Sequence, residues 1–272
     1  MPELPEVEVV RQTLQKNLVG KTIEQVECLY TNIIEGSVSE FQSNLMHKKI
    51  IDIKRYAKYL IFILEDGAFL SHLRMEGKYF YVPKNHESMK HVHVIFHLDN
   101  GYDLLYADVR KFGRMEYKRI EEIYSTPPLS KLGVEANSKD YDIKAIIEKL
   151  HHKNKTIKEL LLNQTILSGL GNIYVDEVLY ASGISPLTKG RMLEEIDVQK
   201  IMSASQEILN HAIELKGTTI RSYTSSLGVM GGFQNFLQVH TLSICKKCNS
   251  EIQKIKIGGR TTYYCSKCQR EL

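Results

Sequence analysis

The sequence predicts an α+β protein of two domains: an N-terminal antiparallel β-sandwich flanked by helices, and a C-terminal helical domain that ends in a four-cysteine hairpin. Three observations support this fold class: strand-like runs fill the first half, helical periodicity dominates the second, and two cysteine pairs close the chain. A chain of 272 residues with 43% hydrophobic and 25% charged residues is long enough for two globular domains. We expect a sandwich over 1–132, a helical domain over 138–236 and a cysteine module over 237–272.

An amphipathic helix opens the chain. Val7, Val10 and Leu14 recur at helical spacing, and Pro5 is typical of a first helical turn, so we expect a helix from Pro5 to about Asn17. Runs rich in β-branched and aromatic residues follow, and turn signals at 65–67 and 99–101 separate them into hairpins. These runs cover 59–64, 68–73, 78–82, 91–98 and 103–107. Short antiparallel strands at this spacing predict the sandwich.

Helical patterns follow a linker at 125–137. The expected helices cover 141–150, 156–167, 172–182 and 197–215. A glycine-rich stretch that ends at Gly232 predicts a loop before the cysteine module.

The last part of the chain carries a metal-binding pattern. Cys245, Cys248, Cys265 and Cys268 form two Cys-x-x-Cys pairs with 16 residues between them. The chain start does not resemble a secretory signal, and no apolar run approaches the roughly 18 residues of a membrane span, so we expect a cytoplasmic protein, in which disulfides are disfavoured. The spacing therefore predicts one structural Zn²⁺ held by four thiolates, with no catalytic role.

Positive charge is concentrated in the same module. From Thr241 onward seven Lys and Arg residues face two Glu residues, whereas the net charge of the whole chain is +4. The tail therefore carries the whole excess, which suits a polyanionic partner and is also compatible with a merely soluble terminal module.

The chain start combines an amine with a carboxylate. If Met1 is removed, Pro2 presents a secondary α-amino group beside Glu3, and such groups titrate at about 7.7–8.0, so a fraction is the free nucleophile. A proline amine that condenses with a sugar aldehyde carbon gives a cationic iminium, which acts as an electron sink. Taken alone, Pro2 favours the simpler interpretation that this segment only starts a helix at Pro5.

A possible phosphate-binding turn lies before the third predicted helix. Gly169 and Gly171 directly precede Asn172, and turns of this kind expose backbone N–H groups, although most glycine pairs before helices are only turns. The position after two predicted helices and after Lys153 is similar to helix–turn–helix DNA-binding elements.

Several further residues allow two interpretations. Arg110 and Phe112 are two apart after a strand, so both could enter a duplex from which a base has been removed, or they could be a surface arginine and a core aromatic. Met75 is by default a core residue. His91 belongs to a Lys-His-Val-His run. Alternate histidines on a strand favour a surface that hydrogen-bonds or contacts phosphate over a pair of metal ligands. Arg260 lies at the expected tip between the cysteine pairs, as a phosphate ligand or a solvated turn residue.

Together these motifs resemble the formamidopyrimidine-DNA glycosylase family, bifunctional repair enzymes that excise oxidised purines from DNA. The resemblance extends nearly end to end and implies a C-terminal helix-two-turn-helix domain with a zinc finger. It rests on Pro2-Glu3-Leu4-Pro5-Glu6-Val7-Glu8, Ala57-Lys58-Tyr59-Leu60, His72-Leu73-Arg74-Met75, Lys90-His91, Asp108-Val109-Arg110-Lys111-Phe112-Gly113, Gly171-Asn172-Ile173-Tyr174-Val175-Asp176-Glu177 and the four cysteines. After Val239 the chain departs from the family's usual Tyr-Gly-Arg, because His240-Thr241-Leu242-Ser243-Ile244 stands there and is shorter.

The resemblance also implies roles for individual residues. Pro2 would attack the sugar C1′ and Glu3 would handle protons. Lys58 would serve β-elimination as proton donor or phosphate contact, and Arg260 would serve δ-elimination. The residues expected to hold the DNA backbone are His72, His91, Lys153, Asn172 and Arg260. The residues expected to fill the void are Met75, Arg110 and Phe112, with Arg110 facing the orphaned cytosine, while 222–232 would close over the extruded base.

Two other functions stay open at this point. An endonuclease VIII-like enzyme for oxidised pyrimidines is one, although Leu4, Arg110 and Phe112 favour the purine branch. A non-catalytic zinc-ribbon DNA-binding protein is the other, if Met1 is retained. The expected partner is damaged double-stranded DNA, bound by a monomer with no protein partner or membrane, in the cytoplasm and at the nucleoid.

Overall fold

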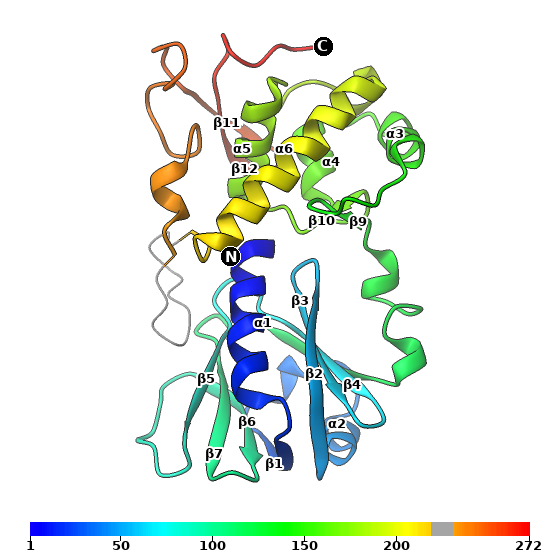
Figure 1. Ribbon diagram of the computed structural model, residues 1–272, viewed down its shortest axis with the longest axis vertical. Helices are drawn as coiled ribbons and strands as arrows, with labels where there is room; N and C mark the ends of the chain where they lie inside the picture. Colours follow the sequence, from blue (N-terminus) through cyan, green and yellow to red (C-terminus); the bar gives the residue numbers. More distant parts are fainter. Residues whose placement is uncertain (219–230) are drawn as a thin grey trace. The chain divides into compact units, whose positions relative to one another are not determined.

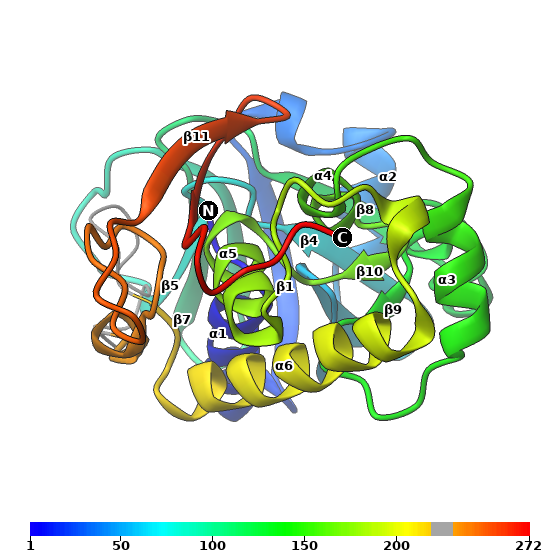
Figure 2. The same cartoon turned by 90° about the horizontal axis from the view of Figure 1, so that it is seen from above.

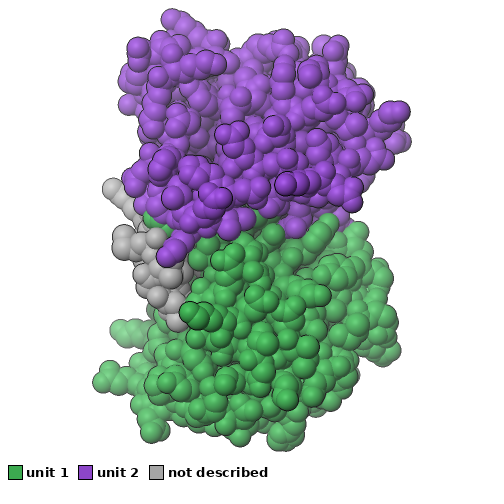
Figure 3. All heavy atoms as spheres, in the orientation of Figure 1, with its two compact units in different colours: residues 1–130, 218–231 green, residues 131–217, 232–272 purple. Residues whose placement is uncertain are grey.

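The computed structural model describes residues 1–218 and 231–272. The chain divides into two compact units, residues 1–130 with 218–231 and residues 131–217 with 232–272, which Figure 3 colours separately. Among the described residues, no helix combines the length and the apolar character that crossing a membrane requires.

The first unit is built around one eight-stranded antiparallel sheet (Figure 1). Its helices are α1 (Leu4–Leu18) and α2 (Val38–Leu45), with short 3₁₀ turns at η1 (Thr31–Ile33), η2 (Ile120–Glu122) and η3 (Leu129–Lys131). Its strands are β1 (Thr22–Cys28), β2 (Lys48–Tyr56), β3 (Tyr59–Leu64), β4 (Ala68–His72), β5 (Lys78–Pro83), β6 (Val92–Leu98), β7 (Tyr102–Ala107) and β8 (Arg114–Lys118). The strand order is β5-β7-β6-β1-β2-β3-β4-β8.

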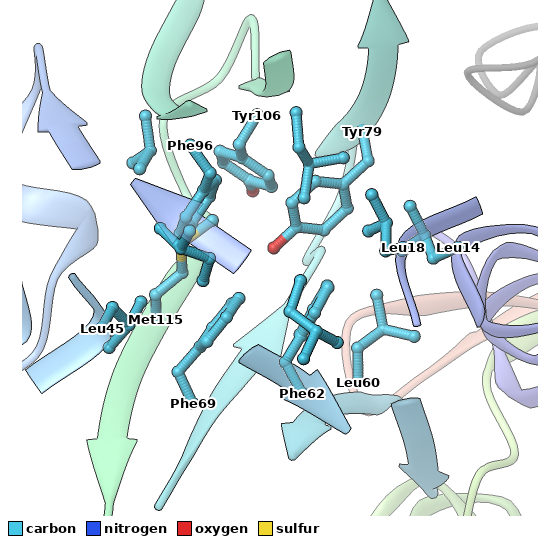
Figure 4. Packing of buried hydrophobic residues seen from close by; sticks show 14 of the residues in the cluster. Leu14, Leu18, Leu45, Leu60, Phe62, Phe69, Tyr79, Phe96, Tyr106 and Met115 are labelled. Atoms are coloured by element: carbon cyan, nitrogen blue, oxygen red, sulfur yellow. The ribbon is translucent and has the colours of Figure 1, made fainter. Parts of the chain in front are cut away.

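Side-chain contacts show that this sheet folds over itself into two layers. Three strands separate β4 from β6 in the sheet order, yet Phe69 of β4 stacks on Phe96 of β6 with ring centroids 5.3 Å apart. Phe62 of β3 likewise packs against Tyr79 of β5, at 5.6 Å. Figure 4 shows these rings turned toward one another inside the core. The predicted sandwich is therefore confirmed.

Helix α1 covers one side of this core. Val7, Val10, Leu14 and Leu18 are buried in the same cluster as the aromatic rings, as the helical spacing predicts. Burial of such side chains contributes about 1.5–3 kcal/mol each relative to exposure. The helix thereby fixes the position of the chain start on the sandwich.

The second unit is mainly helical (Figures 1 and 2). Its helices are α3 (Ile143–His151), α4 (Ile157–Leu162), α5 (Asn172–Ser182) and α6 (Glu195–Glu214), with 3₁₀ turns at η4 (Gly190–Met192) and η5 (Phe233–Phe236). Its strands are the parallel pair β9 (Val134–Glu135) and β10 (Leu167–Ser168) and the antiparallel hairpin β11 (Gln253–Ile257) and β12 (Arg260–Tyr264). The hairpin closes through Gly258 and Gly259, whose φ angles of +54° and +76° suit a two-residue type I′ turn.

One predicted helix is shorter than expected. The sequence predicts a helix over 156–167, but α4 ends at Leu162 and Asn163 takes an extended conformation. The chain then enters β10, where Leu167 pairs with Val134 and Ser168 with Glu135. Pairing with a distant strand, which the local apolar pattern cannot reveal, ends the helix early.

An ionic cluster spans three strands of the first unit. His97 on β6 lies 2.9 Å from Glu27 on β1 and 2.8 Å from Asp103 on β7, while His86 lies 3.7 Å from the other oxygen of Asp103. Burial lowers the pKa of His97, but hydrogen bonds and charges from Glu27 and Asp103 outweigh burial and raise this pKa above 6.5. The folded state therefore binds a proton here more tightly than the unfolded state.

We expect the substitution His97→Gln to lower the stability more at about pH 6 than at about pH 9. A raised folded-state pKa gives stabilisation that is complete below the unfolded pKa, about 6.5, and is lost as the pH rises through the folded pKa. Thermal unfolding of both proteins at the two pH values measures the difference, with the exposed His47→Asn as control. An equal difference in Tm at both pH values would contradict this account.

Candidate active site and zinc centre

The start of α1 is held by a buried carboxylate. Glu3 and Glu6 form a capping box, in which Glu6 Oε2 accepts from the Glu3 backbone N–H at 2.8 Å. The other oxygen, Glu6 Oε1, accepts from the backbone N–H of Thr218 at 2.8 Å and from its hydroxyl at 3.1 Å. Pro2, Glu3 and Glu6 are all buried, whereas Met1 is 40% exposed. The anchoring role of Glu6 is not visible in the sequence, because its partner Thr218 lies 212 residues away.

A second set of hydrogen bonds connects α1 to the turn that carries Lys58. Arg55 donates to Glu8 at 2.9 Å and to the Ala57 carbonyl at 2.9 Å, and Arg11 also pairs with Glu8. Burial raises the pKa of Glu8, but Arg11 and Arg55 more than offset burial and lower this pKa. Ala57 has a φ of +53°, a conformation that side chains disfavour. These bonds hold the turn and its buried Lys58 against α1.

His72 is an uncharged group beside this turn. Its Nδ1 accepts from the Arg74 backbone N–H at 2.9 Å, so the neutral ring carries its proton on Nε2. Burial and the nearby charges of Arg74 and Lys58 lower the pKa of His72 to about 3. The expected contact of His72 with the DNA backbone stays a prediction, and it would be a neutral hydrogen bond.

The proposed void-filling residues lie on surface loops of the first unit. Phe112 is 48% exposed, Arg110 is exposed and stacks its guanidinium 4.7 Å above the Phe112 ring, and Met75 is half-buried. The Asp108 carboxylate fixes their loop, because it accepts from the backbone N–H groups of Arg110 at 3.0 Å, Phe112 at 2.9 Å and Gly113 at 2.8 Å. Sequence alone did not assign Asp108 this role.

Two further features complete this loop region. A Cβ at Gly113 would lie 1.7 Å from the Tyr106 hydroxyl oxygen, so only glycine fits there. The exposed His91 accepts, through its carbonyl, from the Asp108 backbone N–H at 3.0 Å. Thus His91 lies beside the loop of Arg110 and Phe112. The expected closing loop, 222–232, falls almost entirely outside the described residues.

Helix α5 begins at the predicted phosphate-binding turn of the second unit. Asn172 Nδ2 donates to the Thr261 carbonyl at 2.9 Å, directly beside Arg260 in the hairpin. Arg260 is exposed at the start of β12, and Lys153 is half-buried after α3. The structure therefore brings Asn172 to the strand that carries Arg260, while the DNA contacts of Lys153, Asn172 and Arg260 stay predictions.

The four cysteines form a site that fits zinc. Their sulfur atoms all lie within 4.8 Å of one another, with Cys245 3.8 Å from Cys268 and Cys248 3.5 Å from Cys265. A tetrahedron with Zn–S bonds of about 2.3 Å has sulfur atoms about 3.8 Å apart. The donor set is therefore suited to one structural Zn²⁺.

A buried ionic network contacts the β11–β12 hairpin, here called the zinc hairpin. Lys158 on α4 is fully buried, and its ammonium lies 2.6 Å from Asp176 Oδ1 on α5. The second oxygen, Asp176 Oδ2, lies 2.7 Å from His240 Nδ1 and accepts from the Tyr263 backbone N–H at 3.2 Å. Glu177 accepts hydrogen bonds from the three backbone N–H groups of 238–240. Burial raises the pKa of Glu177 by more than these hydrogen bonds lower it.

Comparison with known proteins agrees with the sequence motifs. Three family models match: "Formamidopyrimidine-DNA glycosylase N-terminal domain" at residues 1–115, "Formamidopyrimidine-DNA glycosylase H2TH domain" at 132–224 and "Zinc finger found in FPG and IleRS" at 245–270. The chain belongs to the formamidopyrimidine-DNA glycosylase family. Members of this family are DNA repair glycosylases with AP lyase activity, and the predicted helix-two-turn-helix domain and structural zinc are confirmed.

Relatives match over almost their whole length. Formamidopyrimidine-DNA glycosylases of Streptococcus pneumoniae R6 and Lactobacillus helveticus are 42% and 44% identical over 272 residues, 99% of each chain. A complex between Lactococcus lactis Fpg and abasic-site DNA has a TM-score of 0.92 at 41% identity, covering 99% of this chain and 100% of that one. A Lactococcus lactis FPG mutant with Fapy-dG DNA has a TM-score of 0.93 at 41% identity and the same coverage.

We expect Lys158→Met to lower the free energy of unfolding by about 3–5 kcal/mol, because Asp176 would remain buried without its ammonium partner. Urea titration followed by circular dichroism measures this loss. The exposed Lys144→Met on α3 is the matched control and should change stability by less than about 0.5 kcal/mol. A comparably small change for Lys158→Met would show that the buried pair contributes little.

Proposed function

We propose that this chain removes oxidised purines, 8-oxoguanine and formamidopyrimidines, from duplex DNA and then cleaves the strand by β,δ-elimination. The observation that carries the proposal is the fixed chain start, where Pro2 and Glu3 are buried at a capping box that Glu6 closes. Met1 is 40% exposed, and the proposal requires that it is removed. Its removal converts Pro2 into the free secondary amine that the chemistry requires.

The proposed reaction begins at the sugar C1′. The Pro2 nitrogen forms a bond to C1′, the bond from C1′ to the base breaks, and ring opening gives an iminium, with Glu3 handling the protons. The positive nitrogen acidifies the C2′–H, so loss of this proton expels the 3′ phosphate. A second elimination expels the 5′ phosphate. Lys58 serves the first elimination and Arg260 the second, as proton donors or phosphate contacts.

Reaching C1′ requires extrusion of the nucleotide, which costs a few kcal/mol. The exposed Phe112, the stacked Arg110 and the half-buried Met75 are proposed to occupy the vacated space and to offset this cost, with Arg110 facing the orphaned cytosine. The proposed backbone contacts are His72, His91, Lys153, Asn172 and Arg260. Asp108 supports this assignment, since it holds the backbone of the inserted loop in one conformation.

The preference for purines rests on the Arg110–Phe112 loop and on the solved relative bound to Fapy-dG DNA. An oxidised-pyrimidine enzyme is the competing function, and comparing cleavage of 8-oxoguanine opposite cytosine with that of an oxidised-pyrimidine duplex separates the two. We also propose that the chain acts as a monomer in the cytoplasm and is associated with the nucleoid when bound to DNA.

We expect borohydride to trap the Met1-processed protein covalently on DNA with 8-oxoguanine opposite cytosine, and peptide mapping to locate the adduct on Pro2. Lys58→Met is the informative control, because it removes a candidate amine and leaves Pro2 intact. Trapping on abasic-site DNA should persist in Lys58→Met. An adduct located on a lysine, or the absence of an adduct with the processed protein, would overturn the mechanism.

Removing zinc should weaken DNA binding, because the hairpin that presents Arg260 is closed by the four cysteines. Fluorescence anisotropy with DNA that carries a tetrahydrofuran analogue of the abasic site, which cannot form the iminium, measures the affinity at several salt concentrations. The slope of log K against log salt should become shallower by about 0.9 for each lost phosphate contact. Unchanged affinity after confirmed metal loss would remove Arg260 from the DNA contacts, and recovery on adding Zn²⁺ controls for irreversible damage.

A further inference from the structure

One face of α5 contacts the cysteine-containing segment 237–272, here called the zinc module, at three successive helical turns. Asn172, Asp176 and Tyr180 are four residues apart and therefore share a helix face. Asn172 contacts the Thr261 carbonyl at 2.9 Å, Asp176 the Tyr263 backbone N–H at 3.2 Å, and the Tyr180 hydroxyl the Cys245 sulfur at 3.1 Å. The first two contacts hold backbone groups of β12, whereas the third reaches a zinc-binding sulfur.

Protonation fixes the direction of the third contact. A zinc-bound cysteine is a thiolate and has no proton to donate, so the Tyr180 hydroxyl must be the donor. Hydrogen bonds with a charged partner are shorter and stronger than neutral ones. Cys245 is fully buried, which strengthens the interaction because water does not compete for the sulfur.

Packing keeps the tyrosine in this position. The Tyr180 ring packs against the hydrophobic cluster of Val239, Cys245, Ile252 and Cys265, and the contacts of Asn172 and Asp176 fix the helix on the same module. Ser250 Oγ lies 3.3 Å from the Cys248 sulfur. Each sulfur of the first cysteine pair, Cys245 and Cys248, thus has a hydroxyl group within contact distance.

We propose that Tyr180 is a positioning residue of the zinc centre, whose hydroxyl donates to the Cys245 thiolate, withdraws charge from this sulfur and slows loss of the metal. Partners that orient metal ligands typically change affinity or activity by 10–100-fold when removed. The inference concerns the metal centre and is independent of the lesion that the chain excises. Borohydride trapping on the same preparations reports the proposed function separately.

The test compares Tyr180→Phe with Tyr263→Phe in the zinc-loaded full-length protein. Tyr263 is the matched control, because it packs on the same cluster but its ring contacts His240, with centroids 5.0 Å apart. Transfer of zinc to a chromophoric chelator should be about tenfold faster in Tyr180→Phe and unchanged in Tyr263→Phe. Equal rates in Tyr180→Phe and wild type would overturn the proposal.

A second measurement separates the hydrogen bond from general packing. In the Co²⁺-substituted protein, loss of the donor raises the energy of the sulfur electrons, so the sulfur-to-cobalt charge-transfer band should move to longer wavelength in Tyr180→Phe only. Faster zinc loss without this shift would mean that the ring packs but the hydroxyl does not act on the thiolate, which also overturns the proposal. Circular dichroism confirms that each variant is folded.

Discussion

The carboxylate of Glu6 is the constraint on which the proposed catalytic end depends. It is buried, and it accepts hydrogen bonds from the Glu3 backbone N–H and from the backbone N–H and hydroxyl of Thr218, which compensate the large cost of desolvating its charge. A chain terminus is ordinarily poorly ordered. Here Pro2 and Glu3 are buried at the capped start of α1, and a nucleophile placed there would not need to be ordered again for each reaction.

The second unit also contains a buried charged group at its centre, but this group is the positively charged ammonium of Lys158. The buried ammonium of Lys158 requires Asp176, and the remaining oxygen of Asp176 holds His240 and the backbone of β12. Replacing Lys158 would leave the Asp176 carboxylate buried without its ammonium partner, and replacing Asp176 would take away the carboxylate that lies 2.6 Å from the buried ammonium. The ion pair of Lys158 and Asp176 and the hydrogen bond from β12 to Asp176 therefore hold the β11–β12 hairpin against α5, in addition to apolar packing.

Much of this architecture could be predicted from the sequence, because its signals are local. Cysteine spacing identified the zinc module and the position of the hairpin tip between its two cysteine pairs, and helical periodicity identified α1 and α5. Strands β1, β2 and β8 were missed. Register shifts interrupt the regular pairing of β1 at Ile23 to Gln25 and of β2 at Ile50 to Asp52.

The connections within the site were not predictable in the same way. Glu6 with Thr218, and Lys158 with Asp176, are pairs whose partners are set by the fold, and each residue alone looks like an ordinary helix or loop residue. His240 is a third example, because its partner Asp176 lies 64 residues earlier in the chain.

The three contacts of α5 with the zinc module have a consequence for how this family can vary. A helix advances about 100° per residue, so one inserted or deleted residue between Asn172 and Tyr180 would turn one end of the contact face away from the module. The length of this segment is therefore fixed by geometry, even where side chains are exchanged.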